Sequence, residues 1–181
     1  MNFYISDTHW DHANIMKYCD RPFATVEEMN QAMIENWNRK VGEDDDVYIV
    51  GDMFFYARTP VEYMLCQLKG RKHLIIGNHD CQWMKKVEMA GYFESVQYMT
   101  EIKDGKRDIT LCHYPMMAWH GSNHGSYLIY GHIHNNTGDF FWPLLRKMEN
   151  ALNAGVDVNH FEPVTFEELV ENNRRFRASK G

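Results

Sequence analysis

Five short apolar segments, each followed at once by polar or ionisable residues, are the feature that most restricts how this chain can fold. The segments are NFYIS, DVYIV, HLII, DITLC and SYLIY. Nearly continuous apolar runs of this length are typical of strands that are covered on both faces of a sheet. In α/β folds, functional side chains gather beyond the carboxyl ends of such strands. The sequence therefore predicts a covered sheet with a polar site along one edge.

The segments between these strands carry helix signals. Thr25, Thr59 and Thr165 each stand three residues before a Glu, which is the capping-box pattern of a helix start. Pro60 occupies the first helical position, which proline favours. The helices predicted from these signals span residues 12–19, 26–40, 60–69, 82–90 and 166–177.

A hairpin is expected in the second half of the chain. The segments SVQYMTEI and RDITLC flank Lys103-Asp104-Gly105-Lys106, and Asp-Gly between two such runs is a strong hairpin signal. An antiparallel hairpin after alternating strands and helices predicts a mixed architecture rather than a purely doubly wound sheet. No repeat or linker divides the 181 residues, so one domain spanning residues 1–181 is expected.

The composition of the chain restricts the classes of partner that the protein is expected to bind. The net charge of -6 argues against a general polyanion binder, and no extended nucleic-acid groove is expected. A small phosphorylated substrate stays possible. No apolar run is long enough for a membrane helix, and no signal peptide is visible. The cysteines have no CxxC spacing, so we expect reduced thiols, a cytoplasmic location and no membrane partner. The oligomeric state is not indicated.

The polar residues at the strand ends form a set of oxygen and nitrogen donors with no thiolate among them. They are Asp7, His9, Asp52, Asn78, His113, His132 and His134. Such donors suit Mn, Fe, Zn or Ni better than Ca or Mg. Seven ligands are too many for one transition ion. They suit two ions if one carboxylate bridges, since paired hydrolytic metals lie about 3.5–4 Å apart.

In sequence order these residues form the series D-x-H at 7–9, G-D at 51–52, G-N-H-D at 77–80, a lone His113 and G-H-x-H at 131–134. The series resembles the motifs of the calcineurin-like metallophosphoesterase superfamily, in the same order and each after a strand. The resemblance is to the small bacterial or phage type. It implies a fold of the α+β or α/β class, namely a two-sheet mixed β-sandwich with helices on its outer faces (αββα).

The resemblance also implies a ligand assignment. One ion would take Asp7, His9 and His134, and the other would take Asn78, His113 and His132. Asp52 would bridge the two ions, for which manganese is the first expectation. The glycines at 51, 77 and 131 would let the backbone approach the ions closely.

The implied activity is hydrolysis of a phosphate monoester or diester, on a small or nucleotide-like substrate, by a hydroxide that bridges the two ions. His79 stands beside Asn78 and, by the resemblance, is not a ligand. It is therefore the expected general acid that gives a proton to the leaving alkoxide. Asp80 either orients His79 or begins the next helix as a cap.

Four further residues are candidates for substrate contact: His12, Arg21, His120 and His124. Each also has a structural interpretation, namely a helix turn for His12, a surface arginine for Arg21 and a solvated loop for the other two. The aromatic residues Trp37, Phe54, Phe55 and Tyr56 either line an entrance or belong to the core.

Two functions other than a small-substrate phosphoesterase are compatible with the motifs. One is a nuclease that acts on short or single-stranded ends, and the other is a non-catalytic metal-binding scaffold. A scaffold typically has an eroded site, whereas the seven expected ligands and His79 are all present. The sequence therefore favours an enzyme.

Overall fold

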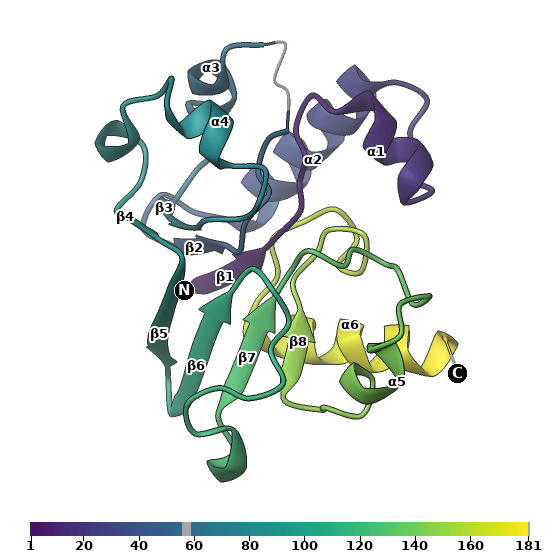
Figure 1. Cartoon of the computed structure of the whole chain (residues 1–181). Coiled ribbons are helices and arrows are strands. Elements are labelled where there is room, and N and C mark those ends of the chain that lie inside the picture. Colours follow the sequence, from purple (N-terminus) through teal and green to yellow (C-terminus); the bar gives the residue numbers. More distant parts are fainter. Residues whose placement is uncertain (56–58, 181) are drawn as a thin grey trace.

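The computed structural model describes residues 1–55 and 59–180. Eight strands form two four-stranded sheets, which lie face to face (Figure 1). The first sheet has the order β1-β2-β3-β4 and the second has the order β5-β6-β7-β8. The strands are β1 (Asn2–Ile5), β2 (Asp46–Ile49), β3 (Arg71–Ile75), β4 (Ser95–Gln97), β5 (Met99–Asp104), β6 (Arg107–Cys112), β7 (Tyr127–Tyr130) and β8 (Ala151–Asn153).

The first sheet is entirely parallel, and the second is mixed. The antiparallel pair is the predicted hairpin β5–β6, in which Asp104 faces Arg107 and Gly105 turns with a φ of 61°. The segment SVQYMTEI is not one strand, because the chain passes from the first sheet to the second at Tyr98. Its first part, β4, pairs with β3, and its second part, β5, pairs with β6.

Successive strand residues point to opposite faces and so build separate cores. In β1, Phe3 and Ile5 face the core beneath helix α2 (Val26–Lys40), whereas Tyr4 faces the core between the two sheets. In β7, Ile129 joins the central core and Leu128 joins a third core on the outer face of the second sheet. The three cores give the layers helix, sheet, sheet, helix, so the predicted αββα sandwich is confirmed.

The helices cover the outer sides of both sheets (Figure 1). They are α1 (Ala13–Tyr18), α2 (Val26–Lys40), α3 (Val61–Leu65), α4 (Cys81–Met84), α5 (Trp142–Leu145) and α6 (Phe166–Ser179), with 3-10 turns at Met89–Gly91 and Ser122–His124. The predicted caps Thr25 and Thr165 each accept a hydrogen bond from the backbone N–H three residues on. Thr59 does not cap α3, whose N-cap is Pro60.

Two helices are shorter than predicted, and one was missed. Helix α3 ends at Leu65 rather than at residue 69. The carbonyls of Gln67 and Lys69 instead accept hydrogen bonds from the Asn38 and Trp37 side chains of α2. The predicted helix 82–90 is a single turn, α4, followed by looser turns. The unpredicted helix α5 has four residues, too few for a periodic pattern.

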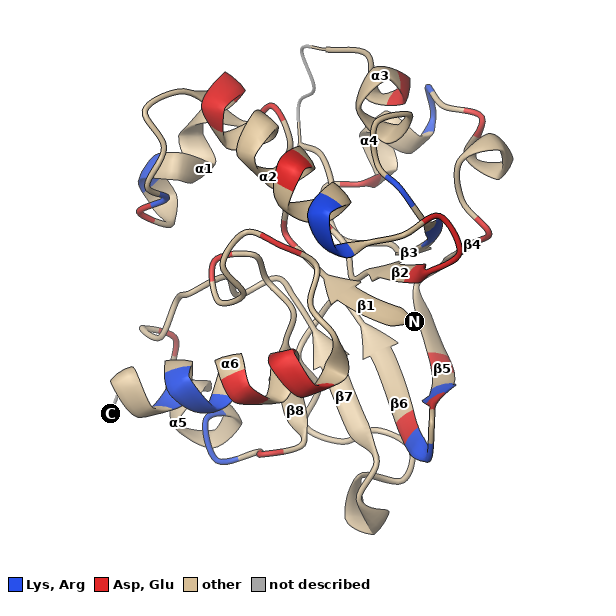
Figure 2. Cartoon of the chain, turned by 180° about the vertical axis from the view of Figure 1, so that it is seen from behind, with Lys and Arg blue, Asp and Glu red and all other residues tan. Residues whose placement is uncertain are grey.

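Charges of both signs are interspersed on the back of the molecule, along α2, α6 and the β5–β6 hairpin (Figure 2). Several of them form ion pairs. Lys40 at the end of α2, for example, contacts Glu162 and Glu168 at 3.1 and 2.7 Å. No helix within the described part of the chain is both long and apolar enough to cross a membrane. The four cysteines are free thiols.

Candidate metal centre and active site

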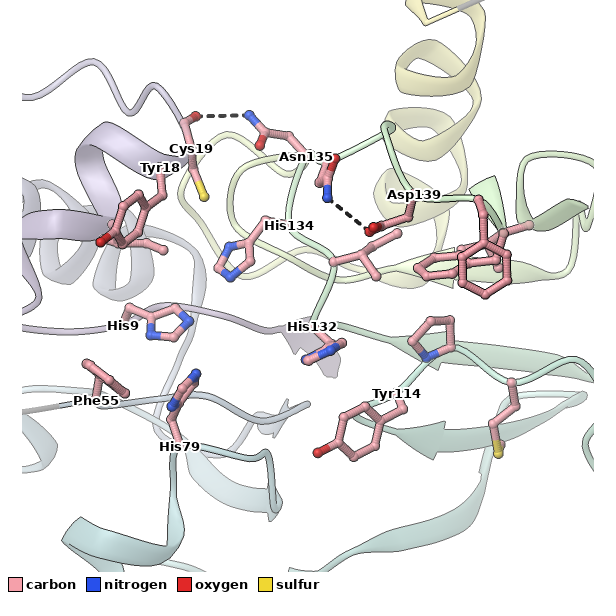
Figure 3. Close-up of a pocket in the computed structure, with 18 of the residues that line it drawn as sticks. His9, Tyr18, Cys19, Phe55, His79, Tyr114, His132, His134, Asn135 and Asp139 are labelled. Carbon is pink, nitrogen blue, oxygen red and sulfur yellow. Dashed lines mark hydrogen bonds between the residues drawn. The ribbon is translucent and has the colours of Figure 1, made fainter. Parts of the chain in front are cut away.

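The polar ends of β1, β2, β3, β6 and β7 meet at one edge of the sandwich. Figure 3 shows four of their side chains, His9, His79, His132 and His134, around one space. Among the described residues, three groups of three have donor atoms within 4.8 Å of one another; one is Cys19, His134 and Asp157, and the other two consist of expected ligands. Of these two, the first group is Asp7, His9 and His134, and the second is Asp52, His113 and His132. Strand ends that are up to 127 residues apart in sequence therefore form one cluster.

Asp52 lies between the two groups. Its Oδ2 is 3.4 Å from Nε2 of His113 and 3.8 Å from Nε2 of His9, so one carboxylate oxygen faces an imidazole of each group. Asn78 is also in the cluster, because its Oδ1 lies 3.1 Å from Nε2 of His113. The structure thus brings together all seven residues that the sequence singled out as ligands.

The backbone of this cluster is unusual. Five of its residues have a left-handed φ between 48° and 73°, although none is glycine: Asp7, His9, Asp52, His132 and His134. This conformation is rare for non-glycine residues and costs on the order of 1–3 kcal/mol each. Such strain persists where the surrounding structure enforces it, and it concentrates at functional sites.

The three motif glycines make room for these side chains. A Cβ atom on Gly77 would lie 2.6 Å from the backbone nitrogen of Asp52, and one on Gly131 would lie 2.6 Å from Oδ2 of Asp7. A Cβ on Gly51 would overlap the ring of His113. The glycines are therefore required by close approach to the clustered side chains, and Gly51 in addition by its φ of 88°.

His113 is held in one orientation by its backbone contact. Its Nδ1 lies 2.8 Å from the carbonyl of Val50, to which it donates, so Nε2 points at Asp52. Burial lowers the pKa of this imidazole. Its hydrogen bond to Asp52 and the charges of Asp7 and Asp52 outweigh burial and raise the pKa to about 9.

His134 is oriented by a buried ion pair that the motifs did not indicate. Its Nδ1 lies 2.8 Å from Oδ2 of Asp157, and Nε of Arg21 lies 2.8 Å from the other carboxylate oxygen. Burial lowers the pKa of His134, but Asp7 and Asp157 raise it to about 11. The sequence shows only that Asp157 stands between two apolar residues, Val156 and Val158, and both are buried in the structure.

His9 provides the clearest sign that a bound group belongs here. The side chain is buried, yet neither ring nitrogen has a hydrogen-bond partner among the described residues. Burial, helped by the nearby His134, lowers its pKa well below the ordinary value, so the ring is neutral. An unpaired buried donor or acceptor costs about 1–3 kcal/mol. A divalent ion bound to the free imidazole nitrogen would satisfy it, and the donor set therefore fits a metal.

The family model for calcineurin-like phosphoesterases matches residues 3–136, which contain the whole cluster except Asp157. The chain belongs to this family. An uncharacterized protein of Methanocaldococcus jannaschii is 34% identical over 173 residues, covering 93% of this chain and 89% of that protein. The gene 66 protein of Mycobacterium phage L5 is 29% identical over 168 residues, and the match covers 74% of this chain and 77% of that protein.

A solved structure gives the same picture for the whole fold. The crystal structure of a protein of unknown function from Aquifex aeolicus has a TM-score of 0.73 and 25% sequence identity, covering 94% of this chain and 98% of that one. Membership of the calcineurin-like family makes this protein a phosphoesterase, a metal-dependent hydrolase of phosphate esters.

Asp80 begins α4 as its N-cap residue, as one expectation had it, but its carboxylate has a role in this phosphoesterase that the sequence did not indicate. Its carboxylate accepts hydrogen bonds from the backbone N–H groups of Asp52, Met53 and Gly77 and from the Trp83 indole. It therefore neither orients His79 nor caps α4 through its side chain. Asp80 ties the Asp52 loop to the Gly77 loop. Burial raises its pKa despite these bonds.

His79 and His12 both line a cavity of about 1140 Å³ that opens over the metal-binding cluster. The His79 backbone N–H donates to Oδ1 of Asp52, and its ring packs edge-on against Phe55 at 4.4 Å. The ring of His12 lies 4.7 Å from the same phenylalanine. Both imidazoles are therefore placed where a substrate would enter (Figure 3 labels His79).

Three substrate-contact predictions are not supported by the placement of the side chains. Arg21 cannot reach a phosphate, because its buried guanidinium is bonded to Asp157 and to the carbonyls of Asp7 and Thr8. His120 and His124 line a separate hollow, where His120 contacts Glu101 at 3.0 Å.

The aromatic residues also divide between the two interpretations. Phe55 lines the cavity, Trp37 and Phe54 are buried in the core, and Tyr56 lies outside the described residues.

Proposed function

We propose that this phosphoesterase holds two divalent ions, manganese foremost, and hydrolyses a small phosphate ester with His79 as the general acid. One ion would be held by Asp7, His9 and His134, and the other by Asn78, His113 and His132, with Asp52 between them. The observation that carries the proposal is the pair of three-residue groups joined by one Asp52 oxygen. When bound, two such ions polarise the phosphoryl oxygens and acidify the attacking water.

The chain's own residues prepare this chemistry. Asp157 and the Val50 carbonyl each bind one nitrogen of a histidine, which turns the other nitrogen of His134 and of His113 toward the cluster. Asp80 fixes the loop that carries Asp52. Because these side chains are already oriented, binding an ion requires little rearrangement.

His79 is suited to proton transfer. Its side chain is 36% exposed, and its Nε2 lies 3.9 Å from Oδ2 of Asp52, so the imidazole sits above the cluster and beside the cavity. A positioned imidazole can give its proton to the oxygen of a departing alcohol. Asn78 lies at the cluster and His79 at its rim, and these positions support the proposed roles of ligand and acid.

The experiment measures metal content and hydrolysis together. Protein stripped of metal with a chelator is reloaded with Mn²⁺, Fe²⁺, Zn²⁺ or Ni²⁺, and its activity is assayed on p-nitrophenyl phosphate and bis(p-nitrophenyl) phosphate. We expect two ions per chain and activity on at least one ester. Two bound ions without activity on either ester would refute the enzymatic role. A single bound ion in the active protein would refute the dinuclear arrangement.

A further inference from the structure

The cavity over the metal-binding cluster has a second wall that the chemistry of the cluster does not explain. One wall carries the imidazoles of His9, His79, His132 and His134. The other wall is formed by residues 114–117 and by residues 140–145, which include α5, and most of these residues are apolar; Figure 3 labels Tyr114 on this side. Phosphate hydrolysis alone requires no such wall.

Exposed apolar side chains gather at this cavity. Ten large apolar side chains are exposed in residues 1–55 and 59–180, and half of them line it: Tyr18, Tyr114, Met117, Phe140 and Leu144. Phe140 is 93% exposed and Leu144 is 57% exposed. Single exposed apolar residues are ordinary, but a gathering of them in one hollow marks a binding surface.

The charge of the cavity excludes many phosphorylated ligands. No lysine or arginine occurs among the described residues that line the cavity. Arg21 lies nearby, but it is paired with Asp157. Among the described lining residues, Asp139 is the carboxylate on the apolar side, and it accepts a hydrogen bond of 2.9 Å from Asn136. A second phosphate at this wall would therefore face a carboxylate with no lysine or arginine among those residues to pair with it, which is unfavourable.

We infer that the substrate carries one phosphate and a large uncharged group, aromatic or aliphatic, that lies on this apolar wall. The inference rests on the proposed function and names the substrate class of the same site. The phosphate occupies the cluster, and the apolar group of the ester reaches Tyr114, Phe140 and Leu144. In hydrolysis, water adds to phosphorus, the P–O bond to one alcohol breaks, and His79 returns a proton to that alcohol.

The test compares esters that differ only in this group. For diester activity, p-nitrophenyl methyl phosphate is compared with p-nitrophenyl octyl phosphate and p-nitrophenyl naphthylmethyl phosphate. For monoester activity, phenyl phosphate is compared with 2-naphthyl phosphate. The p-nitrophenyl ester of thymidine 5'-phosphate, with and without a 3'-phosphate, tests the effect of a second charge. All assays use the metal-loaded protein.

Variants connect any preference to the wall. The double variant F140S/L144S removes apolar side chains from the cavity. The control variant Y63S/Y98S removes two side chains of similar exposure, 62% and 70%, that lie outside it. We expect about tenfold or higher kcat/KM on the larger esters. F140S/L144S should lose that preference, whereas Y63S/Y98S, whose residues lie outside the cavity, should keep both the preference and the activity on the smallest ester.

Four outcomes would overturn the inference. Equal kcat/KM on small and large esters would refute the apolar subsite and leave the proposed function intact. Equal hydrolysis of the thymidine esters with and without the 3'-phosphate would refute the exclusion of a second charge. If the wild type sediments as a dimer and F140S/L144S sediments as a monomer, the wall is a subunit interface rather than a substrate site. Failure on every ester with two ions bound would instead refute the proposed function, and this inference with it.

Discussion

Replacing Asp157 by Asn tests how the fold supports the metal centre. The side chains of Asp157 and Arg21 are 1% and 0% exposed, and the carboxylate contacts Arg21 through both oxygens at 2.8 and 3.2 Å. Removing one partner of a buried ion pair leaves an uncompensated charge and costs about 3–5 kcal/mol. Two backbone carbonyls that also bind Arg21 remain in the variant, so we expect a value near the lower limit, about 3 kcal/mol.

The same change affects the metal centre, because Asp157 holds Nδ1 of His134 at 2.8 Å. Losing such a partner of a ligand typically lowers metal affinity about 10- to 100-fold. Urea unfolding of the metal-free protein measures the stability, and titration with Mn²⁺ measures the affinity. E162Q is the matched control, since Glu162 pairs with Arg39 and Lys40 near the surface and its loss should cost less than about 1 kcal/mol. Equal effects of D157N and E162Q would refute the role of the buried pair.

Three further changes test other parts of the structure. H79A should keep its two ions and lose about 10²- to 10⁴-fold in kcat on an ester of an alkyl alcohol. The loss should be much smaller on an ester that releases p-nitrophenol, because p-nitrophenolate departs without a proton. Equal losses on both esters would contradict the acid role. G131A should lower the free energy of unfolding by about 1–3 kcal/mol in urea, because its Cβ would lie 2.6 Å from Oδ2 of Asp7; a neutral effect would mean that the loop moves freely. D46N should cost less than about 1 kcal/mol at pH 7. The hydrogen bond from Arg71 lowers the pKa of Asp46 from 3.8 to about 2. The contribution of Asp46 to the free energy of unfolding is therefore complete above pH 3.8 and is lost as the pH falls through about 2. In acid unfolding, the stabilities of wild type and D46N should become equal there.

The sequence predicted what depends on local patterns. Apolar runs placed the strands, and the polar residues that follow them placed the cluster, because parallel strands bring their carboxyl ends to one edge. Thr25 and Thr165 marked helix starts through contacts three residues away. Each of these signals lies within a few residues of the structure that it specifies, and it is therefore visible in the chain itself.

What the sequence missed depends on contacts between distant segments. Arg21 and Asp157 are separated by 136 residues, and only the folded chain shows that one neutralises the other. Asp80 was adjacent to the expected acid, yet its bonds go to the loop around Asp52, 27 and 28 residues earlier. The sequence therefore suggested a role for Asp80 from its neighbours in the chain. In the fold, its buried carboxylate instead bonds to a loop that is distant in sequence.

These distant contacts explain how a strained site persists. Five clustered residues hold a left-handed backbone that is unfavourable by on the order of 1–3 kcal/mol each. Arg21 donates to the carbonyls of Asp7 and Thr8, and Asp80 accepts from the N–H groups of Asp52 and Met53, so two of the three strained loops are fixed by a buried charged side chain. Such bonds to charged groups contribute about 1.5–3 kcal/mol each and offset the strain locally. The donors therefore remain oriented without an ion, and the binding free energy of a metal is not consumed in folding these loops.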